Sequence, residues 1–281
     1  MKYKYYGTAA AEGIPALWCE CRVCREAREK GGRNIMSRSQ QLIDDTLLID
    51  FSADNFMHTT MGLPLRNIKT CIVTHNHEDH FYPYDLNMRY ADLAYFIGEE
   101  FPFDLYITKP GADHFRRVHP QYLDDRTPDR VHIHEITPYE PFEAEGYKIT
   151  PLKAAHDPNA GAVIYLIEKD GKCVLHANDT GYFLDETWEY LEKNPVHIDY
   201  ASFDCTETGR FLDNNKTSGH MNLPTVLNVK SRLEKIGMID EKTICTLNHF
   251  SHNGQHTYDE IAEIGKKNGF LVSYDGFEVE F

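Results

Sequence analysis

The sequence predicts a layered α/β fold in which helices cover stacked β-sheets. Short apolar runs rich in β-branched residues recur along the chain, as is typical of strands. Segments with apolar residues three or four positions apart lie between them, as is typical of helices. Strand clusters alternating with helices indicate layered α/β architecture, although the order of the layers does not follow from this pattern. Because no repeat, low-complexity tract or Ser/Gly-rich linker interrupts the 281 residues, we expect one domain covering residues 1–281.

The expected strands are short and buried. They are residues 41–43, 46–50, 71–73, 131–133, 162–167, 173–175, 200–203 and 243–247. Between neighbouring runs stand Asp44-Asp45 and Asp170-Gly171. These residue types are typical of hairpin turns, so we expect two hairpins there.

Three segments have the pattern of helices. Residues 86–97 carry apolar side chains at i, i+4, i+7 and i+11. Residues 223–236 carry a similar stripe, which Asn222 precedes as an N-cap. Thr257 and Glu260 have the spacing of a capping box, which predicts the start of a third helix.

The composition argues against a membrane protein and against a nucleic-acid polymer as partner. The chain has 29 Lys and Arg against 44 Asp and Glu, a net charge of −15 that opposes non-specific contacts with phosphate backbones. No apolar run approaches the length of a membrane span, and residues 1–6 have no signal-peptide core. Seven cysteines, an odd number in a long chain, indicate a reducing compartment. We therefore expect a cytoplasmic protein.

The most informative segment is residues 74–80, Thr-His-Asn-His-Glu-Asp-His, directly after the expected strand 71–73. His75 and His77 point the same way on an extended backbone because side chains alternate. Asp79 and His80 follow a turn and can face a second point nearby. One segment therefore offers ligands to two metal ions, as hydrolytic two-metal sites require. The alternative is a solvated His-rich loop.

Further ligands are expected downstream, because two ions need more than four side chains. His156 lies in a turn between expected strands, Asp179 follows the strand 173–175, and His249 ends the strand 243–247. Side chains at the ends of several strands can converge on one edge of a sheet. Each residue alone is better explained by packing or solubility, but together with the His-rich segment they indicate a metal centre.

A second metal site is indicated near the N-terminus. Cys19, Cys21 and Cys24 form a C-x-C-x2-C block, and three thiolates suit a closed tetrahedral zinc site that needs one more donor. His252 or His256 could supply it. The alternatives are free thiols, or a redox pair of Cys21 and Cys24.

The pattern H-x-H-x-D-H with a later His, Asp and His resembles the metallo-β-lactamase superfamily. This resemblance implies a four-layer αβ/βα metallo-β-lactamase-like sandwich with two divalent ions, Mn or Zn. Asp50, at the end of the strand 46–50, resembles the family's carboxylate that orients ligating imidazoles. By order along the chain, the resemblance implies that His75, His77 and His156 hold one ion, that Asp79, His80 and His249 hold the other, and that Asp179 bridges both.

Two further segments are similar to the PhnP-like phosphodiesterases of the carbon–phosphorus lyase system. One is residues 7–15 with the Cys block that follows, for which the resemblance implies His252 as fourth ligand of a structural zinc. The other is residues 219–223, Gly-His-Met-Asn-Leu, which match a segment around a catalytic His, here His220. A relative in PQQ biosynthesis shares the Cys block but lacks an intact H-x-H-x-D-H, so the intact motif here favours catalysis.

The resemblance implies a metal-dependent hydrolase, a phosphodiesterase acting on a small or cyclic phosphate ester. His220 and Asp79 are the expected catalytic residues, with His220 protonating the leaving group and Asp204 a candidate to orient it. The alternatives are RNA processing of the tRNase Z kind, another hydrolase acting on a lactam, lactone or thioester, and a metal-binding carrier. Residues 101–145 match nothing assignable and are expected to form a lid or an interface, and a homodimer remains open.

Overall fold

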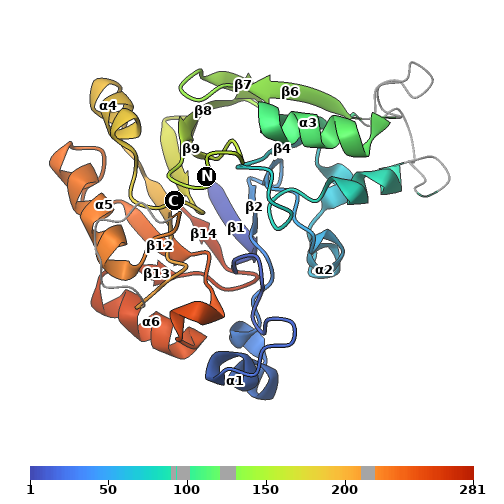
Figure 1. Ribbon diagram of the computed structural model, residues 1–281. Coiled ribbons are helices and arrows are strands. Elements are labelled where there is room, and N and C mark those ends of the chain that lie inside the picture. The colour runs from blue at the N-terminus through green and yellow to red at the C-terminus, as the bar shows by residue number, and fades with distance from the viewer. Residues whose placement is uncertain (90–92, 94–101, 121–130, 210–218) are drawn as a thin grey trace.

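The computed structural model describes residues 1–89, 93, 102–120, 131–209 and 219–281, and it contains two β-sheets of seven strands each (Figure 1). In order across the first sheet, the strands are β14 (Glu278–Glu280), β1 (Lys2–Gly7), β2 (Gln40–Ile43), β3 (Leu47–Ile49), β4 (Thr70–Ile72), β5 (Asp104–Thr108) and β6 (His132–Ile136). Across the second they are β13 (Leu271–Val272), β12 (Ile244–Asn248), β11 (Tyr200–Asp204), β10 (Lys172–Ala177), β9 (Val163–Lys169), β8 (Tyr147–Lys153) and β7 (Phe142–Ala144).

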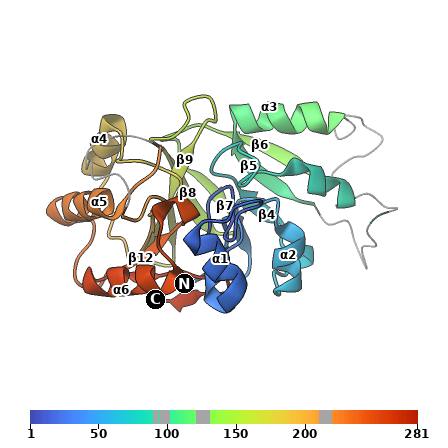
Figure 2. The same cartoon turned by 60° about the horizontal axis from the view of Figure 1, so that its bottom comes forward.

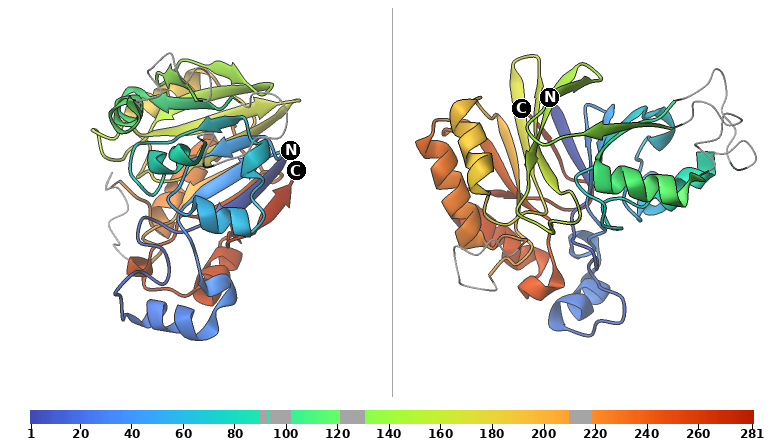
Figure 3. Two further views of the ribbon diagram at one scale, coloured as in Figure 1. Left: turned by 90° about the vertical axis from the view of Figure 1, so that its right-hand side faces the viewer. Right: turned by 45° about the horizontal axis from the view of Figure 1, so that its top comes forward.

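Helices cover the outer faces of both sheets. Helices α2 (Asn55–Thr60) and α3 (Lys109–Val118) lie beside the first sheet (Figure 2). Helices α4 (Asp185–Lys193), α5 (Leu223–Lys235) and α6 (Tyr258–Lys267) lie beside the second. Helix α1 (Arg22–Lys30) projects from the end of the sandwich, as Figure 3 shows. The arrangement is the expected four-layer αβ/βα sandwich.

Three apolar clusters correspond to the three interfaces between these four layers. Leu47 and Ile49 of β3 belong to the cluster between the sheets, whereas Leu48 belongs to the cluster beneath α3. This division follows from the alternation of side chains along a strand. Trp188 of α4 and Val229 of α5 belong to the third cluster, against the second sheet. Because β3 is buried on both faces, its sequence is a continuous apolar run.

The two expected hairpins are present. Asp44 and Asp45 connect the antiparallel strands β2 and β3 with φ of 47° and 60°. Asp170 and Gly171 connect β9 and β10 with φ of 51° and 76°. Two successive residues with positive φ match the right-handed twist of the paired strands, which explains the preference for Asp and Gly.

Two of the three expected helices begin at the predicted caps. The Asn222 side chain accepts a hydrogen bond from the Thr225 amide at 3.0 Å at the start of α5, and Thr257 with Glu260 forms the capping box of α6. In the segment 86–97, the described part is a 3-10 turn at Pro83–Arg89, and the rest except residue 93 lies outside the described residues. Further 3-10 turns are Gly32–Asn34, Leu65–Asn67 and His252–Gly254. No helix in the described part of the chain is long and apolar enough to cross a membrane.

The segment 101–145 contributes regular elements to both sheets. Strands β5 and β6 pair in parallel in the first sheet, helix α3 follows β5 directly, and β7 is the edge of the second sheet. Residues 121–130 lie outside the described residues. A lid or an interface in this segment therefore stays a prediction.

Candidate metal centre and active-site cavity

The strand ends bring the predicted ligands together at one edge of the sandwich. Strands β3 and β4 run parallel to each other, as do β10, β11 and β12 in the second sheet, so their carboxyl ends meet on the same side. Asp50, Asp179 and His249 follow β3, β10 and β12, and all three have positive φ, at 67°, 53° and 62°. Non-glycine residues in this region are uncommon and gather at functional sites.

The first cluster consists of His75, His77, His156 and Asp179, whose ligand atoms all lie within 4.8 Å of one another. His77 Nδ1 lies 3.0 Å from His75 Nε2 and 3.2 Å from His156 Nε2. Asp179 Oδ2 lies 3.0 Å from His75 Nε2. The structure therefore brings together the three imidazoles that were predicted to share one ion.

The second cluster consists of Asp79, His80, His249 and again Asp179. His80 Nε2 lies 3.2 Å from Asp79 Oδ2, 3.1 Å from Asp179 Oδ2 and 3.2 Å from His249 Nε2. Asp179 is the residue common to both clusters, which is the position a bridging carboxylate requires.

These spacings fit a metal centre. Two nitrogens bound to one ion at about 2.1 Å are about 3.0 Å apart at a right angle and about 3.4 Å apart at the tetrahedral angle. The observed contacts of 3.0–3.2 Å among His75, His77, His156, His80 and His249 fall in this range. The mixed His and carboxylate donor set suits Zn or Mn.

Each ligand imidazole turns its other ring nitrogen toward a hydrogen-bond acceptor or a carboxylate. His80 Nδ1 donates to Asp50 Oδ2 at 2.7 Å, and His249 Nδ1 donates to Thr206 Oγ1 at 2.7 Å. The remaining partners are Thr74 Oγ1 for His75 at 3.0 Å, Gly219 O for His156 at 3.0 Å and Asp157 Oδ2 for His77 at 3.5 Å. Such partners set the tautomer and the orientation of metal-ligating histidines. In the neutral form that binds a metal, each ring therefore directs its lone pair to the cluster.

Burial and neighbouring charges shift the pKa values of these groups in different directions. Burial lowers the pKa of His75 to about 4, so this imidazole is neutral near pH 7 and its lone pair is available. Burial alone would raise the pKa of Asp179, but the surrounding imidazoles, His249 first, outweigh it and hold this pKa well below its usual range. Burial would likewise lower the pKa of His80, but the carboxylates of Asp79 and Asp50 raise it.

His220 lies beside the two clusters rather than within either. Its Nδ1 is 3.0 Å from Asp179 Oδ1 and 3.3 Å from both Asp204 Oδ2 and Thr206 Oγ1. Burial opposes a charge on His220, yet Asp179 and Asp204 outweigh it and raise the pKa to about 11. Asp204 is fully buried and also accepts from the Met221 amide at 2.8 Å, which fixes the backbone next to His220.

A cavity of about 260 Å³ opens onto these residues. Its lining includes His77, Asp79, His156, Asp179, His220 and His249. It also includes Glu12, Thr206, Glu207 and Asn253, none of which was a predicted site residue. Glu12 stands in the singled-out segment 7–15, but no residue pattern marks the other three.

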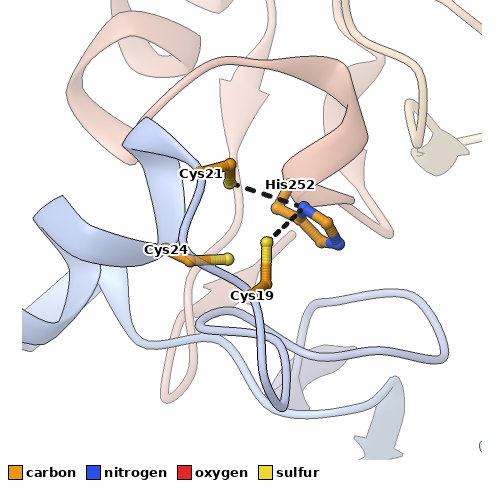
Figure 4. Close-up of side chains that lie close together, drawn as sticks. All are labelled: Cys19, Cys21, Cys24 and His252. Carbon is orange, nitrogen blue, oxygen red and sulfur yellow. Dashed lines mark hydrogen bonds between the residues drawn. The ribbon is translucent and has the colours of Figure 1, made fainter.

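The N-terminal thiols also converge. Cys19, Cys21, Cys24 and His252 lie with their ligand atoms within 4.8 Å of one another, and Figure 4 shows one imidazole nitrogen facing the thiols of Cys19 and Cys21. His252 Nδ1 is 3.6 Å from each of these two sulfurs. A tetrahedral zinc with bonds of about 2.3 Å to sulfur and about 2.0 Å to nitrogen separates such ligands by about 3.5 Å, close to the observed distances. His256, the other candidate, instead contacts Gly254 O at 2.6 Å.

Comparison with known proteins identifies the family. The sequence model of the beta-lactamase superfamily domain matches residues 45–239, more than half of the chain. The chain belongs to the beta-lactamase superfamily. Over 45 residues it is also 51% identical to a protein of Korarchaeum cryptofilum (strain OPF8) described as a UPF0173 metal-dependent hydrolase. That match covers 16% of this chain and 20% of the relative, so it spans about a fifth of the relative's length.

Solved structures of low sequence identity share the fold over the whole chain. A diphosphatase of the PhnP family has a TM-score of 0.70 at 18% identity, covering 100% of this chain and 97% of that chain. Zn²⁺-bound PqqB from Methylobacterium extorquens has a TM-score of 0.74 at 20% identity, with 100% of both chains covered. Human tRNase Z, short form, has a TM-score of 0.66 at 15% identity, covering 100% of this chain and 99% of that chain. The predicted superfamily and the four-layer fold are confirmed.

Proposed function

We propose that this superfamily member is a metal-dependent hydrolase, and specifically a phosphodiesterase that acts on a small or cyclic phosphate ester. The observation that carries the proposal is the pair of donor clusters that share Asp179, with His220 on the wall of the same cavity. Two adjacent sites with open positions are typical of hydrolysis at phosphorus. The two clusters would hold Zn or Mn, and Cys19, Cys21, Cys24 and His252 would hold a structural zinc.

Bound divalent ions at such a centre supply a water of lowered pKa and offset the charge of the phosphoryl group. The chain's own residues do the rest. Asp179 belongs to both clusters and so fixes the distance between them. Asp50 orients His80, and Thr206 orients His249. His220 donates a proton to the departing alkoxide, because its Nδ1 is held by Asp204 and Thr206 while the ring borders the cavity.

A small substrate is favoured over RNA. The cavity of about 260 Å³ suits a small ester, and the net charge of −15 opposes contacts along a nucleic-acid backbone. The three-Cys block beside His252 and the fold likeness to a PhnP-family diphosphatase support the PhnP-like branch. With seven cysteines unpaired and three of them facing His252, we also propose a reducing, cytoplasmic location.

Two substrates with different leaving groups test the proposal. The protein reconstituted with Zn or Mn should hydrolyse bis(p-nitrophenyl) phosphate and a nucleoside 2′,3′-cyclic phosphate. Removing a general acid costs about 10²–10⁴-fold when the leaving group is a sugar alkoxide, and much less when it is nitrophenolate, which needs no proton. We therefore expect His220→Ala to lose far more activity on the cyclic phosphate than on the nitrophenyl ester.

His197→Ala is the matched control, because His197 is an exposed histidine outside the lining of the active-site cavity. This variant should retain both activities. Equal losses on the two substrates in His220→Ala would refute the general-acid role. If the metal-loaded protein turned over neither substrate, the proposed phosphodiesterase activity would be refuted.

A further inference from the structure

Glu12 stands between the two metal-site candidates. It lies in the segment that joins β1 to the Cys block, and its side chain, 29% exposed, lines the active-site cavity together with His77, Asp79 and His249. The same carboxylate faces His252 of the Cys/His cluster. Glu12 thus faces the Cys/His cluster and also borders the active-site cavity.

The contacts of Glu12 fall on three consecutive residues. Its Oε1 accepts hydrogen bonds from Ser251 Oγ and from Asn253 Nδ2, the latter at 3.2 Å, and it lies 3.5 Å from His252 Nε2. These residues follow His249 with a single residue between, and the chain at His249 has a positive φ of 62°. One side chain therefore anchors the segment that carries a ligand of each site.

The orientation of the His252 ring determines which of its nitrogens faces Glu12. His252 Nδ1 faces Cys19 and Cys21, so Nε2 is the nitrogen that points to Glu12. When Nδ1 uses its lone pair for a metal, the neutral ring carries its proton on Nε2. A carboxylate opposite that N–H raises the basicity of the ligand and fixes its orientation.

We propose that Glu12 is a positioning residue that couples the Cys/His zinc site to the active-site metal centre. Through His252 it raises the affinity for zinc, and through Ser251 and Asn253 it holds His249 in place for the neighbouring ion. The inference rests on the proposed metal sites, but its zinc readout does not depend on phosphodiester hydrolysis.

Two variants separate the charge of Glu12 from its role as an anchor. Glu12→Gln keeps an oxygen that can accept from Ser251 but removes the charge opposite His252. Loss of such a partner carboxylate typically costs 10–100-fold in metal affinity, so we expect zinc at the Cys/His site to bind 10–100-fold more weakly in competition with a chromophoric chelator. Glu12→Ala also removes the anchor, so it should in addition lower the metal content of the His/Asp centre.

Glu20→Gln is the matched control. Glu20 lies in the same block, between Cys19 and Cys21, but its side chain is 74% exposed and pairs with Arg28 at 3.2 Å. Wild-type zinc affinity in Glu12→Gln, or an equal loss in Glu20→Gln, would overturn the proposal. So would a folded Glu12→Ala with full metal content at the His/Asp centre. If Glu12→Ala does not fold, the zinc affinity of Glu12→Gln decides.

An absence of hydrolysis in the wild-type protein would count against the proposed function alone, because the zinc comparison does not use a substrate. Conversely, wild-type zinc affinity in Glu12→Gln together with normal hydrolysis would refute only the coupling. The two failures are therefore distinguishable.

Discussion

Replacing Asp50 with asparagine probes how strongly one buried carboxylate controls the metal centre. Asp50 is fully buried and accepts hydrogen bonds from His80 Nδ1 at 2.7 Å, from the Thr74 amide at 2.7 Å and from Thr74 Oγ1 at 2.9 Å. Asparagine has nearly the same shape and tolerates the positive φ of 67° at this position. The substitution therefore removes a charge and an acceptor while the backbone stays the same.

The expected loss of metal affinity follows from the hydrogen bond that His80 Nδ1 donates to Asp50. A hydrogen bond to a charged group contributes about 1.5–3 kcal/mol, and loss of a carboxylate behind a metal-bound histidine typically costs 10–100-fold in affinity, or about 1.4–2.7 kcal/mol. The two free-energy ranges agree. We expect Asp50→Asn to bind the ion at His80 10–100-fold more weakly, with the fold unchanged.

Chelator competition followed by metal analysis measures this affinity, and circular dichroism checks the fold. Asp54→Asn is the control, because Asp54 is a nearby carboxylate that accepts from Arg38 N and Nη1 at 2.8 and 2.9 Å rather than from a predicted ligand. Affinity in Asp50→Asn within twofold of the wild type would refute the reasoning.

Two further predictions concern stability. His58 is buried, with Nδ1 2.6 Å from Gln40 Oε1 and Nε2 2.8 Å from Ser37 Oγ, and burial lowers its pKa from 6.5 to about 4. Because the unfolded chain binds a proton at His58 more tightly than the folded protein does, the contribution of neutral His58 to the free energy of unfolding is complete above pH 6.5 and falls by about 2–3 kcal/mol toward pH 4.5. In urea titrations, the free energy of unfolding should therefore depend less on pH in His58→Gln than in the wild type. Equal pH dependence in the two proteins would contradict a buried, neutral His58. Thr257→Ala should remove the capping box with Glu260 and cost about 1 kcal/mol by calorimetry, whereas Thr257→Ser should not, and an equal loss in both would argue against the cap.

The local part of the candidate site could be predicted from the sequence because its geometry is set within a few residues. His75 and His77 are two positions apart after a strand, so they share a side, and the structure places His77 Nδ1 3.0 Å from His75 Nε2. His156, Asp179 and His249 could be nominated because they stand at strand ends. Which strand ends meet depends on sheet order, which came from the family resemblance.

Several elements were not among the expected ones because their local sequence signals are mixed. Strand β1 has no β-branched residue, although Lys alternates with Tyr at Lys2–Tyr5, and two of its three tyrosines, Tyr3 and Tyr5, pack between the sheets. Helix α3 begins with Lys109, Pro110 and Gly111; proline is tolerated in a first turn, but the Pro-Gly pair is also typical of a turn, so the start of this helix is ambiguous in the sequence. In such segments tertiary packing, rather than local propensity, decides the conformation.

The sequence by itself determined the donor chemistry: a His- and Asp-rich segment behind a strand, a three-thiol block, and the caps of two helices. Local patterns left the distant partners open, and the family resemblance nominated them. Only the tertiary structure shows that they converge: it places His252 rather than His256 beside the thiols, and it brings Glu12 against Ser251 across 239 positions of the chain. The physical reason is that side-chain alternation and capping are local properties of the backbone, whereas long-range contacts depend on how whole strands pair and stack.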